Sequence, residues 1–385
     1  MKKMYWHAHN LPRIYIVTIC IIALIGMAIV ETHKRIVPQK YYKEKVAAAK
    51  LAAEAFHHVR SMRQRLSIAV NLGDDPQQSG LIGKQLTNIT TDQGVLSAKQ
   101  TSINPNIAAI FVDWLKQLNL KKRDVVAVGT TGSFPALNIC MLAAIKTLGL
   151  RPLIIYSAGA SQYGANVPGF TWLDIQNQLE SAHIFNFKPL AVSLGGARDI
   201  AYGMTPQGKE ILLNTIEKYK LTYLGPRGTI DSSNKRMEIY KRAAGDKPIK
   251  AYINIGGGMA SIGLKAVPGS AEIKHVSYLA PHGLHTGVVK SLPIGLVNVD
   301  SVAVRFLREG VPVINIRHVA QKLREQYHLP RNPKVTPAIG VGAIFALESY
   351  NQWLASIILG VIVLVLIILA IVSRKYRIRY IRSPH

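Results

Sequence analysis

Cysteine is scarce in this 385-residue chain. Its two cysteines are Cys20, within a long apolar run near the N-terminus, and Cys140, within a segment whose pattern predicts a helix. Because two cysteines in such different settings are not expected to pair, a disulfide framework is excluded. A chain of this length is long enough to form a hydrophobic core that stabilises its fold without disulfides.

Acidic residues are also few, with 21 aspartates and glutamates against 47 lysines and arginines. The formal net charge is +26. A field of this sign attracts polyanions, which include nucleic acid, anionic lipid and acidic polymers. A general bias of the organism's proteins toward lysine and arginine is the alternative explanation.

Charge is absent from two long apolar runs, residues 14–30 and 354–373. A membrane-spanning helix needs about 20 apolar residues, with about 17 as the lower limit. Each run is therefore predicted to be a transmembrane helix. A cleaved signal peptide is the alternative for the first run, but its end, AIVETHKR, lacks the small-residue pattern of a cleavage site. A buried core helix is the alternative for the second run, which its length and lack of charge disfavour.

The orientation follows from the lysines and arginines beside the second run. None occurs in residues 336–353, just before it, whereas residues 374–385 read RKYRIRYIRSPH. Because basic flanks stay in the cytoplasm, the C-terminus is predicted to be cytoplasmic, and two spans then place the N-terminus there as well. At the first run, the residues that follow are more basic than those that precede it, which favours the opposite orientation. This difference in basic residues is smaller than the one at the second run, so the second run decides the prediction. The predicted localisation is a two-pass protein of the cytoplasmic (inner) membrane with its main domain extracytoplasmic (periplasmic), where nucleic acid is not an expected partner.

Composition and periodicity divide the chain into eight segments. After the first apolar run, an alanine-rich segment has helical spacing and suggests a stalk leaving the membrane. The predicted segments are a cytoplasmic N-terminus (1–13), a transmembrane helix (14–30), a juxtamembrane stalk helix (31–70), an irregular linker (71–105), an extracytoplasmic α/β domain (106–335), a second linker (336–353), a second transmembrane helix (354–373) and a basic cytoplasmic tail (374–385).

The predicted domain has continuous Val/Ile/Leu strands that alternate with amphipathic helices. Examples are the strand DVVAVG, the helix FPALNICMLAAIKTLGL and the strand RPLIIYS. This alternation is typical of an α/β fold with a mostly parallel sheet and helices on both of its faces. The predicted architecture is such a domain, flanked by one N-terminal and one C-terminal transmembrane helix.

Gly-rich turns follow several of the predicted strands. In a parallel sheet these turns share the carboxyl edge, where open α/β sheets bind ligands. The alternative is that glycine only makes tight strand-to-helix turns. The candidate ligand- or anion-binding residues are Thr130, Thr131, Gly132 and Ser133 in the first turn, Gly195, Gly196, Arg198 and Asp199 in the second, and Gly256, Gly257 and Gly258 in the third.

Nucleotide and metal motifs are absent from these turns. No turn contains the lysine of the G-x-x-x-x-G-K-[ST] phosphate loop, and GGGMASIG departs from the G-x-G-x-x-G register. Neither ATP nor NAD is therefore expected, and no cofactor is predicted. The H-E-x-x-H zinc pattern does not occur at the histidine pair of the loop APHGLHTG, so no metal site is predicted either.

Three residues are candidates for catalysis. Ser133 lies on a strand-to-helix turn, but no glycine follows two residues later as in a G-x-S-x-G elbow. It is therefore a nucleophile, an anion contact or a helix cap. His282 and His285 are the best acid–base candidates because histidine titrates near neutral pH.

Arg198 and Asp199 lie side by side in a Gly-flanked turn. Arg198 can clamp a carboxylate in bidentate fashion, or it can pair with Asp199. These two alternatives are open from the sequence.

The chain resembles a known family in its layout and in three segments. The segments are VVAVGTTGSFPALN, SLGGARDIAYGM and INIGGGMASIG, between a basic N-terminal anchor and a C-terminal span with an arginine tail. This combination resembles the poly-gamma-glutamate system protein family. The resemblance implies an accessory membrane protein of poly-γ-glutamate (capsule-type polymer) synthesis and export. Its partners would be the polymer, or another acidic polymer, and the other membrane subunits of the system.

The resemblance assigns no catalytic residues, so three functions stay open. In the first, the extracytoplasmic domain binds or guides the polyanion. In the second, it is an amidase or transferase that trims or attaches the γ-linked polymer. In the third, it is a scaffold for the synthase subunits.

Overall fold

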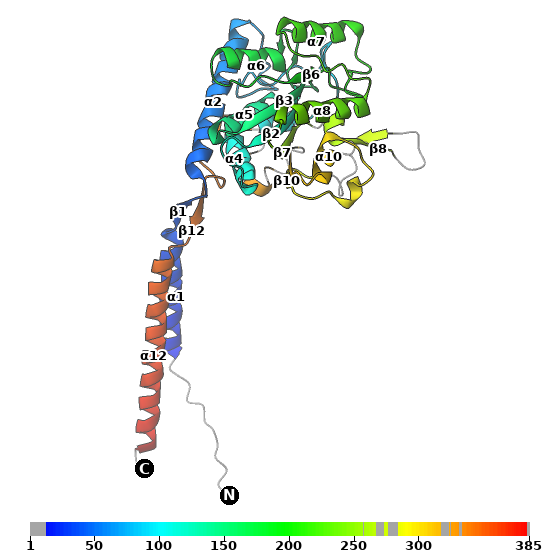
Figure 1. Ribbon diagram of the computed structural model, residues 1–385. Helices are drawn as coiled ribbons and strands as arrows, with labels where there is room; N and C mark the ends of the chain where they lie inside the picture. Colours follow the sequence, from blue (N-terminus) through cyan, green and yellow to red (C-terminus); the bar gives the residue numbers. More distant parts are fainter. Residues whose placement is uncertain are drawn as a thin grey trace. The chain divides into compact units, whose positions relative to one another are not determined.

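The structure is a computed structural model that describes residues 13–256, 258–266, 273–275, 284–316, 323, 325–330 and 333–382 (Figure 1). The chain forms two compact units. One consists of both ends of the chain, up to Gln39 and from Ala346 onward, and the other extends from Lys40 to Phe345.

The larger unit contains a six-stranded sheet in the order β10-β11-β7-β2-β3-β6. All neighbouring strands are parallel except β10, which is antiparallel to β11. The predicted α/β class with a mostly parallel sheet is therefore confirmed. The strands are β2 (Val125–Thr131), β3 (Arg151–Ser157), β6 (Ala191–Ser193), β7 (Ile249–Ile255), β10 (Gly287–Val289) and β11 (Val313–Ile316).

The strand sequences explain why both faces of this sheet are covered. All seven residues of β2 are buried. Since successive side chains of a strand point to opposite faces, Val126 and Val128 join one apolar core and Val125 and Ala127 join another. Near-continuous apolar strands of this kind are typical of parallel sheets buried between two layers of helices.

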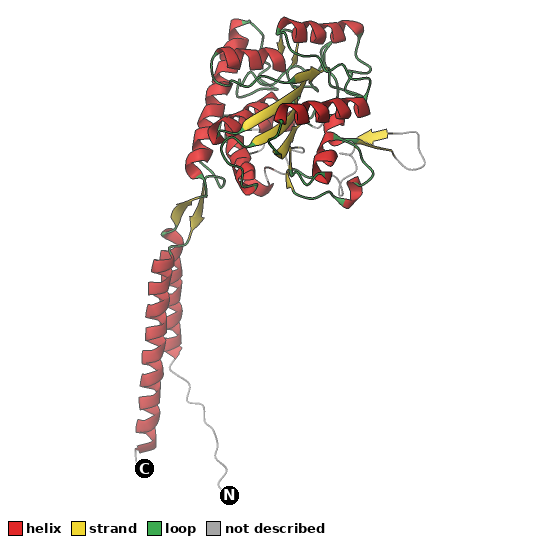
Figure 2. Ribbon diagram, viewed as in Figure 1, coloured by secondary structure: helices red, strands yellow, loops and turns green. Residues whose placement is uncertain are grey.

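The helices pack on both faces of the sheet, as Figure 2 shows. One core includes residues of α2, α4, α5, α6 and α7, and the other includes residues of α8 and α10. Their bounds are α2 (Tyr42–Arg65), α4 (Ile107–Gln117), α5 (Pro135–Leu148), α6 (Trp172–Ser181), α7 (Pro206–Lys218), α8 (Thr229–Ala244) and α10 (Val302–Arg308).

The strand order contains a switch point between β2 and β7. From β2 the chain continues to β3 and β6 on one side, and it then returns to β7 and β11 on the other. In open α/β sheets the crevice at the carboxyl ends of such a strand pair is the usual ligand site. The first and third of the predicted Gly-rich turns follow these two strands.

The alanine-rich helix α2 belongs to the larger unit, contrary to the prediction of a stalk over residues 31–70. Ala48, Ala52 and Ala55 are fully buried, and the helix packs against α4 and α5. Its small side chains allow the close approach of helix to helix that this packing needs. The predicted linker, residues 71–105, is also part of this unit. Its short helix α3 (Leu96–Ser102) has a buried C-terminal half.

The smaller unit pairs the two ends of the chain. Helix α1 (Arg13–Thr32) contacts α12 (Gln352–Arg382), and Figure 1 shows the two helices side by side. At Gly26 an added Cβ would lie 2.5 Å from Cγ2 of Ile358, so glycine is needed for this approach. Strand β1 (Arg35–Pro38) pairs antiparallel with β12 (Ala346–Ser349).

One helix among the described residues is long and apolar enough to cross a membrane, and it is the segment Gln352–Val372 of α12. This segment coincides with the predicted second span. The apolar helix Val17–Thr32 within α1 is shorter than that criterion requires. The first span therefore stays a prediction.

Candidate functional site

The turn after β2 is bound tightly into the protein. The Ser133 N–H donates to Oγ1 of Thr131 (3.1 Å), and Nδ2 of Asn138 in α5 donates to the Thr131 carbonyl (2.9 Å). The Gly132 N–H donates to the carbonyls of Ser157 and Gly159. Two backbone N–H groups that could have bound an anion are thus already occupied. Thr130, which is 2% exposed, lies within the sheet and not at its surface.

The turns after β2 and β7 meet at the switch point. A Cβ built on Gly256 would lie 2.4 Å from Oγ1 of Thr131, and one on Gly258 would lie 3.6 Å from Cγ2 of Thr131. Gly256 also has a φ of 91°, which favours glycine. The structure therefore brings the first and third predicted turns together. Gly257 lies outside the described residues.

The second predicted turn, after β6, reaches toward the same region. The Arg198 N–H donates to Sδ of Met259 (3.2 Å), which follows the turn of β7. Gly195 and Gly196 have φ angles of 76° and 67°. Arg198, Asp199 and nearby Ala201 also have positive φ, which is uncommon for residues other than glycine. A turn with so many left-handed residues persists only where its surroundings hold it.

The buried carboxylate of Asp199 holds this turn. It accepts hydrogen bonds from the hydroxyls of Ser193 (2.8 Å), Ser157 (3.2 Å) and Ser232, and it pairs with Nη2 of Arg236 at 3.0 Å. The side chains of Asp199 and Arg236 are 3% and 1% exposed. The ion pair is therefore fully buried and surrounded by hydroxyl groups.

Arg198 does not pair with Asp199, so its other alternative, a clamp for a ligand carboxylate, stays a prediction. Its side chain is exposed, and the guanidinium lies over the ring of Tyr202, 4.6 Å from the ring centroid. Asp199 pairs with Arg236 of α8 and not with its neighbour in the sequence. Arg198 thus remains an exposed cation beside the switch point, whereas Asp199 is a structural residue.

A buried lysine lies next to Ser133, and the sequence analysis missed it. Lys99 of α3 is 2% exposed. Its Nζ donates to Oγ of Ser161 (2.9 Å) and to the carbonyl of Ser133, and it lies 3.8 Å from the ring centroid of Phe134. Within the described residues no carboxylate pairs with it. Burial lowers the pKa of Lys99 from its usual value to about 7, because the charged amine loses its hydration.

Ser133 and Ser161 have different positions relative to this lysine. Oγ of Ser133 accepts a hydrogen bond from the Ser161 N–H (3.0 Å). Lys99 contacts the Ser133 carbonyl and the Ser161 hydroxyl. The hydroxyl that faces the amine is therefore that of Ser161, in the turn after β3, and not that of the predicted nucleophile.

His285 does not join these residues. His285 is exposed, and its carbonyl accepts a hydrogen bond from Nδ2 of Asn315 in β11 (3.2 Å). Strand β7 lies between β11 and β2, so the His285 backbone lies about two strand spacings, roughly 10 Å, from β2. His282 lies outside the described residues. Across the described part of the chain, no group of three His, Cys, Asp or Glu residues could hold a metal ion.

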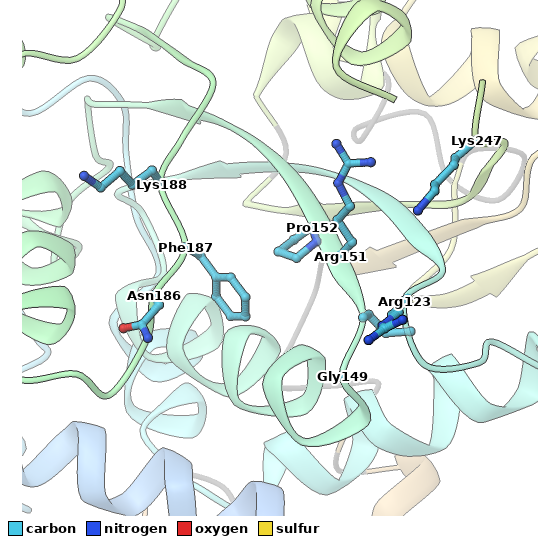
Figure 3. A pocket seen from close by; sticks show the side chains of 9 residues that line it. Arg123, Gly149, Arg151, Pro152, Asn186, Phe187, Lys188 and Lys247 are labelled. Carbon is cyan, nitrogen blue, oxygen red and sulfur yellow. The ribbon is translucent and has the colours of Figure 1, made fainter. Parts of the chain in front are cut away.

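A basic pocket lies at the opposite, amino edge of the sheet (Figure 3). Its volume is about 440 Å³, within the usual range for small-ligand sites. Arg151 is the first residue of β3, and Arg123 shortly precedes β2. The lining residues are Arg123, Gly149, Leu150, Arg151, Pro152, Asn186, Phe187, Lys188 and Lys247.

The lining of this pocket carries four cations and no acidic side chain. Lys188 pairs with Glu180 at 3.5 Å, and Nη2 of Arg151 donates to the Ala243 carbonyl (2.9 Å). All four cations are exposed. In Figure 3 Arg123, Arg151 and Lys247 lie on one side of Pro152 and Phe187, and Lys188 lies on the other with its amine directed away from the ring. Such an arrangement can bind a ligand with several negative charges and short apolar segments between them.

No protein-family model, curated protein or solved structure matches this chain. The functional proposals therefore depend on the chemistry of the two edges of the sheet. The amino edge offers positive charge in an open pocket. The carboxyl edge offers a hydroxyl beside a buried amine.

Proposed function

We propose that this protein is a membrane-anchored accessory protein of poly-γ-glutamate synthesis or export whose α/β domain binds the acidic polymer. The basic pocket at the amino edge of the sheet carries this proposal. Poly-γ-glutamate has one carboxylate on every residue, separated by short methylene segments. The four cations of the pocket match the carboxylates, and its apolar residues Pro152 and Phe187 match the methylene groups.

The energetics favour a polymer over a single small anion. An exposed ion pair contributes only about 0.2–1 kcal/mol, so one carboxylate in an open pocket binds weakly. A chain that presents several carboxylates at once engages several cations and gains effective concentration from their linkage. Binding of this kind is weakened by salt, because exposed charges are screened.

The membrane arrangement in this proposal has two spans. The segment Gln352–Val372 crosses the membrane, and the basic residues 374–385 stay in the cytoplasm. Helix α1 crosses beside α12, and their contact at Gly26 supports this pairing. The domain then lies outside the cytoplasm, where the exported polymer passes. Other membrane subunits of the system are the expected partners of the two helices.

Binding by the full-length protein in nanodiscs of neutral lipid tests the proposal. We expect salt-sensitive binding of poly-γ-glutamate that the double variant Lys188→Gln/Lys247→Gln weakens. The loss of two exposed ion pairs predicts about 2- to 30-fold weaker binding, measured by isothermal titration calorimetry.

The matched control is Lys50→Gln/Lys220→Gln, which removes the same charge from exposed positions on α2 and after α7. It should bind as tightly as the unmodified protein. Equal weakening in both double variants would show that net charge, and not the pocket, attracts the polymer. Equal affinity for polyaspartate or a neutral glycan would contradict the polymer-specific proposal.

A further inference from the structure

We propose that Lys99 and Ser161 form a base–nucleophile pair for acyl transfer, in which Ser161 attacks the carbonyl carbon of an ester or amide. Nζ of Lys99 lies 2.9 Å from Oγ of Ser161. This distance permits direct proton transfer between the two atoms. The pair lies at the carboxyl edge of the sheet, which is the ligand-binding edge of open α/β folds.

The surroundings of Lys99 favour the uncharged form of its amine. The described contacts of Nζ are the Ser161 hydroxyl, the Ser133 carbonyl and the Phe134 ring, and none of these carries a charge. Removal from water lowers the pKa to about 7. The 14-residue helix α5 begins at Pro135, the residue after Phe134, whose ring lies against Nζ of Lys99. The positive end of a helix dipole also disfavours an ammonium group.

Ser161 has the rigidity that a nucleophile needs. It is 9% exposed and Lys99 is 2% exposed, and the hydrogen bond between them is buried. The Ser161 N–H donates to Oγ of Ser133, and its carbonyl accepts from the Gly164 N–H (3.0 Å). Hydrogen bonds thus fix the backbone on both sides of Ser161, which holds its hydroxyl in position for attack. Ser133 is a positioning residue in this site.

The reaction proceeds in two steps that return the site to its starting state. Neutral Lys99 accepts the Ser161 proton as Oγ bonds to the acyl carbon. The bond from that carbon to the leaving oxygen or nitrogen breaks, and Lys99 gives its proton to the leaving group. A water molecule or an acceptor amine then attacks the acyl-serine, gives a proton to Lys99, and releases Oγ, which takes the proton back.

This inference is independent of the polymer-binding proposal. Strand β3 begins at Arg151, in the basic pocket, and ends at Ser157, four residues before Ser161. Seven residues of strand separate the two edges by about 20 Å. If the experiment contradicts the proposal for one site, the proposal for the other site is unaffected, because each site is tested with its own ligands and its own variants.

Acylation of the full-length protein in detergent micelles by p-nitrophenyl acetate and by a fluorophosphonate tests the inference. We expect one adduct per chain by intact-mass analysis, located on Ser161 by peptide mapping. The rate should rise with pH through about 7, because only the neutral amine accepts the proton. Ser161→Ala should abolish the adduct. Lys99→Met should slow it at least about 100-fold, since a general base contributes about 10²–10⁴ in rate.

Two further variants keep the experiment decisive. Ser133→Ala should slow acylation and leave the adduct on Ser161, and Lys121→Met, at an exposed lysine, should change nothing. If Lys99 only ties the two turns together, Lys99→Met will lower the melting temperature and the unmodified protein will form no adduct. That result would overturn the inference, as would equal rates in Lys99→Met and the unmodified protein. If Lys99→Met does not fold, the inference is tested instead by the pH profile of the unmodified protein and by the loss of the adduct in Ser161→Ala.

Discussion

Asp199 and Arg236 show how single residues hold the carboxyl edge of the sheet. Their ion pair joins the turn after β6 to helix α8, and the hydroxyls of Ser157 and Ser193 attach it to the ends of β3 and β6. A buried ion pair need not add stability over an apolar pair, but the loss of one partner leaves an uncompensated charge. The left-handed residues of this turn depend on the same contacts.

At this scale we predict that Asp199→Ala lowers the free energy of unfolding by about 3–5 kcal/mol, because Arg236 is left buried without a counter-charge. Arg198→Ala is the matched control. Its side chain is exposed, so its effect should stay within about 0.5 kcal/mol. Urea unfolding of the full-length protein in micelles measures both. Similar losses in the two variants would contradict the structural role of the buried pair.

The sequence identified residues whose role is local and missed those whose role depends on packing. Thr205 directly precedes Pro206, a residue pair typical of a helix start, and its Oγ1 accepts from the Gly208 N–H (3.2 Å). The residues that form such a cap lie within four consecutive positions, so the sequence alone reveals it. Lys99 precedes Ser133 by 34 positions and lies in a polar, irregular segment, so only the tertiary fold reveals that it is buried. Arg236 likewise has no local feature that distinguishes it from an exposed helical arginine.

Among the elements, the strands were predictable and the role of α2 was not. Short apolar runs such as the VVAV of β2 indicate buried parallel strands directly. The alanine-rich pattern of α2 predicts a helix. It does not distinguish an isolated helix from a tightly packed one, because alanine is suited to both. The burial of Ala48 and Ala52 against α4 and α5 distinguishes the two.

For this element we predict that Ala52→Glu destabilises the domain by at least about 3 kcal/mol, because it places an unpaired carboxylate in the core. Lys50→Glu introduces the same side chain at an exposed position of the same helix and should have little effect. Thermal unfolding of both variants measures the difference. In a solvent-exposed stalk the two substitutions would be equally tolerated, and that outcome would restore the original prediction.

On the scale of the whole molecule, the limits of the domain were harder to predict than its class. The folded unit extends over Lys40–Phe345 and not over residues 106–335. Contacts between its two ends explain the difference. The ring of Tyr42 meets that of Phe345 edge to face, with centroids 6.4 Å apart, and Nε2 of Gln77 donates to the Pro333 carbonyl (2.7 Å). Contacts across more than 200 residues leave no periodic pattern in a sequence.

The proposed two-pass arrangement makes a prediction about labelling in spheroplasts. With a membrane-impermeant maleimide, Asn214→Cys on α7 should react in intact spheroplasts. Asn10→Cys and Ser383→Cys should react only after lysis. Cys20 lies in the proposed first span and Cys140 is buried, so the unmodified protein provides the background.

Each labelling outcome has a definite meaning. Reaction of Asn10→Cys in intact spheroplasts would show that α1 does not cross the membrane. Loss of this cysteine from the mature protein would identify a cleaved signal peptide. Protection of Asn214→Cys would place the domain in the cytoplasm and contradict the proposed contact with exported polymer.

The pairing of β1 with β12 has a consequence for the unfolded chain. Pro38 is paired with Ala346, with their Cα atoms about 5 Å apart, so the two ends of the folded unit Lys40–Phe345 are held close together. As long as this pair and the two helices persist, the unfolded domain is a closed loop and not a free chain. Closing a loop of this length removes conformational entropy worth about 6 kcal/mol, as a disulfide would. The paired ends of the chain thus act as a non-covalent clasp in a protein whose two cysteines are both free.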